Sequence, residues 1–154
     1  MNKPSLYAML LTSLWIGSAF AAPALTVRGP WIAETPPTAR VQAGYMELVN
    51  EGASPVVVVG AKSPDFAQVE MHRTINAQEG ARMEPQAELR VEPGATLLLA
   101  PGGLHLMLIE PKRRLVAGDK AEIELRLQDG TAIRTAVEVR SRAAPAAGHE
   151  HHHH

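Results

Sequence analysis

Hydrophobic and polar residues alternate along much of the chain with a period of two, which is typical of β-strands that bury one face. Turns rich in glycine, proline, asparagine and aspartate separate these short segments. No segment shows a convincing helical period, so the sequence predicts an all-β fold, specifically a Greek-key β-sandwich. The expected strands are residues 24–28, 42–49, 56–59, 66–74, 89–91, 96–99, 104–109, 121–127 and 132–139, and residues 82–84 are expected to be a short strand or a loop.

Three local patterns make this expectation more specific. Asp129-Gly130, between two cleanly alternating segments, is the strongest hairpin signal in the chain. The β-branched run at residues 56–59 is expected to be a strand buried on both faces or a central strand of the sandwich. Residues 29–31 and the proline-rich residues 34–38 should form a stiff loop, because proline fixes its backbone dihedral and has no N–H to donate.

The first residues have a different character. An apolar run at residues 7–20 follows Lys3, and a small-residue pattern then permits cleavage after Ala21. This pattern predicts a secretory signal peptide in residues 1–21, whereas the alternative, a membrane anchor, needs about 20 densely apolar residues. We therefore expect export to the periplasm, cleavage, and no stable membrane insertion afterwards. The remaining length fits one folded domain, residues 22–140, which is expected to be monomeric.

Residues 141–154 are rich in alanine, proline, glycine and histidine. They have too little apolar bulk to pack, so we expect a disordered tail. Its end is explained either by an affinity tag or by a native tail. If the tail is native, its imidazoles form a second metal site that favours Cu(II), because affinities of divalent first-row metals peak at copper. The candidate ligands of this second site are His149, His151, His152, His153 and His154.

Composition argues against several classes of function. The 154 residues contain no cysteine, so they provide no disulfide, no thiol for lipid attachment and no thiolate copper site. The formal net charge is −1, and no basic stripe with interleaved aromatic residues indicates a nucleic-acid partner. Motifs of hydrolases, such as a nucleophile elbow or a phosphate loop, do not occur. We therefore expect that the protein is not an enzyme.

Four candidate metal ligands occur in the middle of the chain, at characteristic spacings. Ten residues separate His72 from Met83, twenty-one separate Met83 from His105, and one separates His105 from Met107. Two imidazoles and two neutral, polarizable thioethers suit Cu(I) better than Zn, Mg or Ca. This set of donors therefore predicts a copper(I) site.

The alternation of residue types also predicts how these side chains point. Leucines alternate with His105 and Met107 across residues 104–108, so both candidates should lie on the same side of one strand. His72 should face the same way on a second strand. Met83 is expected to fold over the metal from a flexible connection.

Nearby residues are open to two interpretations. Glu70 falls on the same side as His72, and it is either a partner that orients the imidazole or a solvated surface carboxylate. Met46 and Met71 are expected to fill gaps in the core, as single methionines usually do. The basic residues 112–114 form either a docking patch for an acidic partner or ordinary loop charge.

The four-ligand spacing resembles the signature of the PCuAC family, the periplasmic copper chaperones that serve the CuA centre of cytochrome c oxidase. Glu70-Met71-His72, residues 101–107 and the basic residues after them carry this resemblance, which covers residues 27–139. The resemblance implies a cupredoxin-like β-sandwich that binds one Cu(I) through the four residues named above. It also implies delivery of the ion to cytochrome c oxidase subunit II or to a thiol-bearing copper assembly factor.

Two other functions remain open. A periplasmic copper buffer or resistance protein would have the same site but no dedicated recipient. A β-sandwich interaction module would carry these histidines and methionines incidentally, and its Cu(I) affinity would then not respond to leucine at Met83 and Met107.

Overall fold

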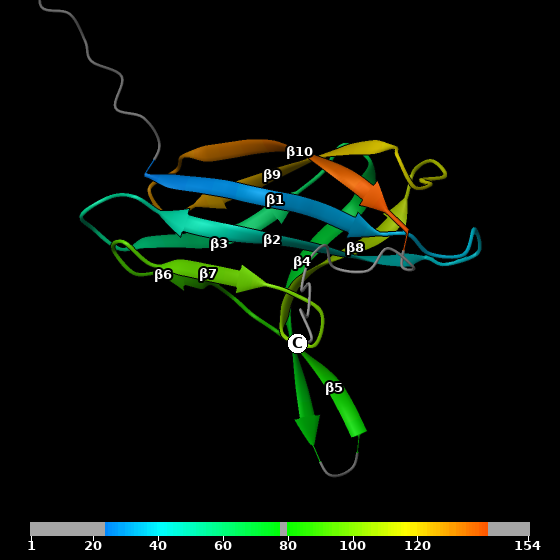
Figure 1. Ribbon diagram of the computed structural model, residues 1–154, viewed down its shortest axis with the longest axis horizontal. Coiled ribbons are helices and arrows are strands. Elements are labelled where there is room, and N and C mark those ends of the chain that lie inside the picture. Colours follow the sequence, from blue (N-terminus) through cyan, green and yellow to red (C-terminus); the bar gives the residue numbers. More distant parts are fainter. Residues whose placement is uncertain (1–23, 78–79, 142–154) are drawn as a thin grey trace, which may run out of the picture.

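In the computed structural model, residues 24–77 and 80–141 are described, and all their regular secondary structure is β-strand. The strands are β1 Leu25–Ala33, β2 Val41–Asn50, β3 Val56–Lys62, β4 Phe66–Ala77, β5 Gly80–Pro85, β6 Leu89–Val91, β7 Thr96–Leu99, β8 Leu104–Pro111, β9 Lys120–Leu127 and β10 Ala132–Arg140 (Figure 1). Every strand expected from the sequence is present, so the all-β fold is confirmed. Among the described residues, no helix is long and apolar enough to cross a membrane. The predicted signal peptide and residues 142–154 of the tail lie outside the described residues.

Within the described ranges the strands form one sheet that folds over on itself. Their order is β5-β4-β8-β7-β2-β1-β10-β9-β3-β6. Most neighbours are antiparallel, whereas β1 pairs in parallel with β10 and β7 pairs in parallel with β8. Strand β3, near one end of this order, packs against β4, near the other end (Figure 1). Apolar side chains fill the space between the two layers, and the largest fully buried ones include Phe66, Ile32, Leu48, Leu106, Leu108 and Ile123. Removal of these side chains from water is the main term that stabilises such a sandwich.

Strand β1 continues where the sequence indicated a loop. Three steps from Arg28 to Trp31 in β1 correspond to two steps from Glu47 to Tyr45 in β2, so β1 contains a β-bulge. Gly29 lies in this bulge with φ +54°, a conformation that glycine adopts without steric cost. The prediction of a loop at residues 29–31 was therefore wrong, because the bulge absorbs the irregular residues and strand pairing resumes.

Strand β3 is less buried than its run of valines suggested. Val57 and Val58 are buried, but the side chain of Val59 is exposed. The pairing with β9 shifts between Val58 and Gly60, which places Val59 outside the regular ladder. Burial of residues 56–59 on both faces, the first of the two expectations, was therefore wrong at Val59, whereas β3 does lie inside the sheet, between β9 and β6.

The hairpin that joins β9 and β10 is confirmed at Asp129-Gly130. The two strands are antiparallel neighbours from the Ala132–Arg126 pair to the Glu138–Lys120 pair. Gly130 has φ +87°, and its N–H donates to the Leu127 carbonyl across the turn at 3.0 Å. The Thr131 N–H donates to Asp129 Oδ1 at 2.8 Å, and this hydrogen bonding holds the pKa of the Asp129 carboxyl below its usual value.

A buried carboxylate links three strands on the side of the sandwich formed by β3, β9 and β10. The Glu124 side chain is buried and accepts from Lys62 Nζ at 3.0 Å and from Arg134 Nε at 2.8 Å. These hydrogen bonds, first to Lys62 and then to Arg134, hold the pKa of the Glu124 carboxyl below its ordinary value. Glu124 thus stabilises the folded state while it is ionised.

Replacement Glu124→Gln is expected to flatten the acid side of the stability profile. Because the folded-state pKa is depressed, the contribution of Glu124 is fully present above the unfolded carboxyl pKa of about 4.3 and is lost as the pH falls through the folded pKa. The urea midpoint of the wild type should therefore fall more between about pH 6 and about pH 3 than that of the variant. Urea unfolding followed by circular dichroism measures both slopes. Glu122→Gln, at an exposed position of the same strand, should keep the wild-type dependence of the urea midpoint on pH. The same wild-type dependence in Glu124→Gln would contradict the stabilising role of ionised Glu124.

Candidate metal centre

The pairing of β4 with β8 places three of the four candidate ligands on one patch. In this antiparallel pair, His72 lies opposite His105, and Glu70 lies opposite Met107. Residues directly opposite each other, and residues two apart on one strand, point to the same face of a sheet. The same-side placement of His72, His105 and Met107 that the sequence predicts is therefore confirmed.

The other face of the same two strands belongs to the core. Met71 pairs with Leu106, between the His72–His105 pair and the Glu70–Met107 pair. The side chains of Met71 and Leu106 are both buried in the hydrophobic cluster. Met46 is also buried there, so the prediction that both methionines fill the core is confirmed. The alternation of residue types along β4 and β8 thus separates the core side chains from the candidate ligands.

The two imidazole rings are close enough to share one ion. Their centroids are 6.0 Å apart and their planes are inclined by 37°. Bonds from imidazole nitrogen to a metal are about 2 Å long, so a single ion between the rings can contact one nitrogen of each. Both residues are nearly enclosed, with exposed fractions of 8% for His72 and 5% for His105. The pair is therefore a shielded, preorganised part of the candidate centre.

Hydrogen bonds assign a role to each ring nitrogen. His105 Nδ1 lies 3.1 Å from the Gly103 carbonyl oxygen, which only accepts, so Nδ1 carries the proton and Nε2 keeps its lone pair. His72 Nε2 lies 2.7 Å from Glu70 Oε2, and it donates to that carboxylate. His72 Nδ1 then keeps a lone pair, and this buried atom has no hydrogen-bond partner. Each imidazole thus offers one free nitrogen as a donor.

A short hydrogen-bonded chain supports His72 from its own strand. Gln68, Glu70 and His72 occupy alternate positions of β4, and therefore point to the same side. The Gln68 side-chain amide donates to Glu70 Oε1, while Glu70 Oε2 accepts from His72. Glu70 was expected from the sequence as one candidate partner of His72, whereas Gln68 was not, although the period of two along β4 could have indicated it.

Met83 lies at the rim of this patch. It is opposite Thr74 in the β4–β5 pair, and His72 is opposite Pro85, so Met83 is a diagonal neighbour of His72 on the same face. Its side chain is 58% exposed. The expectation that Met83 comes from a flexible connection was wrong, because residues 80–85 form strand β5. This strand and the end of β4 project from the sandwich as an arm (Figure 1).

The donors around the two histidines are of mixed type. In the part of the chain that the structure describes, no cluster of three or more histidine, cysteine, aspartate or glutamate side chains has the geometry to hold a metal ion. The thioethers of Met107, which is half-buried, and Met83 lie on the same face as the imidazoles. The candidate set is therefore two nitrogens and two sulfurs, which favours a soft monovalent ion.

Other candidate features lie away from this centre. The basic residues 112–114 follow β8, at the opposite end of that strand from His105, and Arg113 pairs with Asp65 at 3.1 Å. A role for these residues in docking at the copper site is therefore not supported by their position. The histidines of the candidate Cu(II) site, at positions 149 and 151–154, lie outside the described residues.

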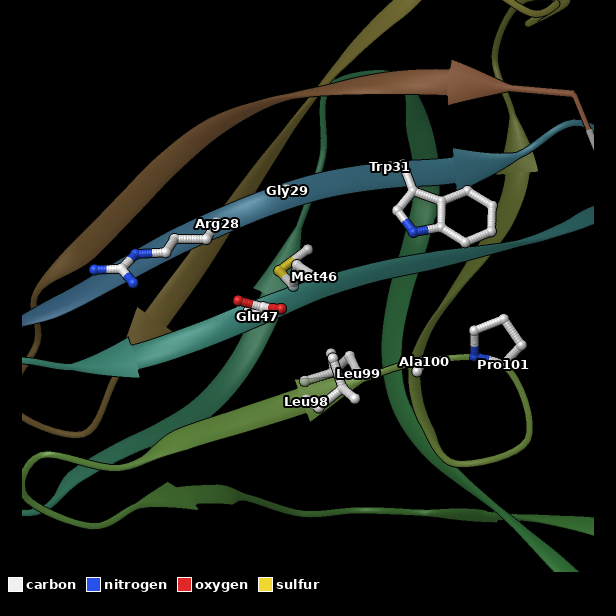
Figure 2. A pocket seen from close by; sticks show the side chains of 9 residues that line it. All are labelled: Arg28, Gly29, Trp31, Met46, Glu47, Leu98, Leu99, Ala100 and Pro101. Atoms are coloured by element: carbon white, nitrogen blue, oxygen red, sulfur yellow. The ribbon is translucent and has the colours of Figure 1, made fainter. Parts of the chain in front are cut away.

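Two hollows lie on the described part of the molecule, and one of them borders the patch. One of about 210 Å³ lies beside the turn that leads to His105, and Figure 2 shows Trp31 facing it from β1, with Leu98 and Pro101 on its other side. The Trp31 ring packs against Tyr45, with ring centroids 4.7 Å apart, so Trp31 has a packing role. A second hollow of about 400 Å³ is bordered by Glu70 and His72. The candidate centre can therefore be approached along the edge of β4.

Comparison with known families gives a match over most of the chain. The family described as "Putative lipoprotein LpqE-like" matches residues 25–139. A relative from Leifsonia xyli subsp. xyli (strain CTCB07), named "Putative lipoprotein Lxx21020", is 36% identical over 99 residues, which are 64% of this chain. The matched region spans 60% of that relative's own length.

Solved structures extend the comparison to the fold. The solution structure of CuI-DR1885 from Deinococcus radiodurans is 32% identical, with a TM-score of 0.62, over 82% of this chain and 85% of its own. The copper-bound PCuAC domain from PmoF2 is 24% identical, with a TM-score of 0.66, over 79% of this chain and 97% of its own. The predicted cupredoxin-like β-sandwich is thereby confirmed, and the resemblance to PCuAC proteins holds at the level of the fold.

Proposed function

This chain belongs to the LpqE-like family, and from that premise we propose that it is a Cu(I)-binding metallochaperone of the bacterial cell envelope. Its ligands are His72, His105, Met107 and Met83. The proposal places the protein in the periplasm after removal of a signal peptide in residues 1–21. Two of the similar structures are named as copper-bound and Cu(I)-bound proteins, which supports copper as the ion.

One observation carries the proposal. His72 Nδ1 is buried, keeps a lone pair because Nε2 donates to Glu70, and has no hydrogen-bond partner. A buried polar atom without a hydrogen-bond partner costs free energy in the folded state. A bound ligand that contacts such an atom removes this cost. The second ring lies on the neighbouring strand with its centroid 6.0 Å away, and its Nε2 also keeps a lone pair because Nδ1 donates to the Gly103 carbonyl. A metal ion between the rings satisfies both nitrogens.

The chemistry of the remaining donors selects the ion. Thioether sulfur is soft and uncharged, and it favours Cu(I) over harder divalent ions. Met107 adds one sulfur from the same strand as His105, and Met83 adds the other from the neighbouring arm. Because the set contains no anionic ligand, it binds copper less tenaciously than thiolates do. Such a site can hold the ion and still release it.

Release follows from competition between ligands. A thiolate of a partner is a charged and softer donor than a thioether, so transfer of Cu(I) to it is downhill. The proposed recipient is cytochrome c oxidase subunit II or a thiol-bearing assembly factor of its CuA site. Four donors on one Cu(I) leave no position for a substrate, so the proposal does not include catalysis. A buffer without a recipient would bind Cu(I) equally well but would not accelerate metallation of a thiol protein.

Copper K-edge X-ray absorption on the reduced, copper-loaded protein tests the ligand set. We expect two sulfur and two nitrogen neighbours around one Cu(I) per protein. The double variant Met83→Leu/Met107→Leu should lose both sulfur neighbours and keep the two nitrogens, because leucine preserves volume but offers no donor. Met46→Leu, a buried core position on another strand, is the matched control and should keep the wild-type spectrum. A wild-type spectrum without sulfur would refute the proposed site.

A further inference from the structure

The four proposed ligands differ strongly in how much they are enclosed. The imidazoles of His72 and His105 are buried and Met107 is half-buried, whereas the Met83 side chain is 58% exposed. This difference follows from the order of strands. Strand β8 lies inside the sheet and β4 has neighbours on both sides around His72. Among the strands of residues 24–77 and 80–141, by contrast, β5 is the last in the order and has only β4 beside it.

The two methionines therefore have different surroundings. Met107 lies between Glu70 on β4 and Ala43 on β2, each directly opposite it in the sheet. Met83 has only Thr74 opposite it, and the other edge of β5 carries no strand among the described residues. Nearly every side chain of β5 is exposed. Met83 can therefore move away from a bound ion without disturbing the core, whereas Met107 is held between two strands.

We propose that Met83 is the exchanging ligand, the one that an incoming thiolate replaces during copper transfer. This inference rests on the proposed function, and it assigns the order in which the ligands leave. The thiol has already lost its proton to solvent, because the thiolate is the attacking species. A bond from copper to the partner sulfur forms while the bond to Met83 Sδ breaks. Copper remains Cu(I), and no electron is transferred.

The retained ligands keep the ion in place until the partner has bound it. His72 and His105 come from two paired strands and are oriented by Glu70 and by the Gly103 carbonyl, so they form the rigid part of the site. The exposed side of the patch, where Met83 lies, is the side from which a partner can approach. The ion is thus shared between both proteins before it leaves the first one.

Two single variants, Met83→Leu and Met107→Leu, test this order. Cu(I) affinity is measured by competition with bicinchoninate, and transfer is followed by stopped-flow absorption of the Cu(I)–thiolate bond with a synthetic Cys-Xaa-Xaa-Cys peptide. Both variants should lose Cu(I) affinity by about tenfold or more. Tenfold is the lower end of the loss that follows when residues supporting a metal site are replaced. A ligand already lost in the transition state stabilises only the starting complex, so its removal should accelerate transfer by the same factor by which affinity falls.

The two variants should therefore differ in the rate at which they transfer copper to the peptide. We expect Met83→Leu to accelerate transfer by a factor equal to its affinity loss, and Met107→Leu to change the transfer rate less than about threefold for a comparable loss. Equal acceleration in both variants, or acceleration in Met107→Leu alone, would overturn the assignment of Met83 and leave the proposed function intact. Unchanged Cu(I) affinity in both variants would overturn the proposed function itself.

Discussion

Replacement His105→Ala is expected to abolish tight Cu(I) binding while the sandwich stays folded. Loss of this residue removes one of the two paired imidazoles and leaves His72 as the other imidazole of the proposed centre. Substitution of residues that merely orient metal ligands costs about 10- to 100-fold in affinity, so loss of a ligand itself should cost more than about 100-fold. Competition with a Cu(I) chelator under reducing conditions measures this change.

A matched variant separates ligand loss from general disturbance of the sheet. Thr74→Ala changes a half-buried residue on β4, two positions beyond His72 on the same face, without removing a copper donor. We expect it to keep the wild-type Cu(I) affinity. Urea unfolding of His105→Ala should still show one cooperative transition, because the ring lies outside the hydrophobic core cluster. Wild-type affinity in His105→Ala would show that copper does not bind at this pair.

Replacement Leu106→Ala should have the converse effect, a large loss of stability with the metal ligands retained. Leu106 is fully buried on β8 between His105 and Met107, with its side chain in the core. Truncation of a buried leucine removes transfer free energy and leaves a cavity, which together cost about 2–5 kcal/mol in the free energy of unfolding. Leu106 lies opposite Met71 on one side and Gly44 on the other. Since glycine has no side chain to move into the cavity, little relaxation is expected on that side.

Urea unfolding of the copper-free protein measures this loss. Leu98→Ala, a leucine that is largely exposed on β7, is the matched control and should cost less than about 1 kcal/mol. The fraction of Leu106→Ala that remains folded should bind Cu(I) within about threefold of the wild type, because the donors on the opposite face of β8 are unchanged. A loss in Leu106→Ala as small as that in Leu98→Ala would contradict the described core.

Much of the fold follows from local patterns. The period of two in residues 104–108 is enough to separate the leucines that enter the core from His105 and Met107 on the other face. Asp129-Gly130 is enough to predict the last hairpin, because a left-handed glycine matches the twist of two antiparallel strands. These features depend on residues close together in the sequence, so they can be read without the tertiary structure.

Other local features could not be predicted, because distant strands decide them. The bulge at Gly29 appears only when β1 is aligned with β2, and the exposure of Val59 appears only when β3 is aligned with β9. Met83 belongs to a strand rather than to a loop because β4 extends far enough to pair with it. In each case a hydrogen-bonding partner from another segment overrides the local preference.

From the residues alone one can predict most of the strands, the separation of core and ligand faces, and four donors whose softness suits Cu(I). The pairing of distant strands is needed to place His72 opposite His105, to leave one nitrogen free on each ring beside Glu70 and Gly103, and to expose Met83 at an edge. Side-chain direction within a strand is a local property, whereas the register between strands depends on backbone pairing across a long stretch of chain.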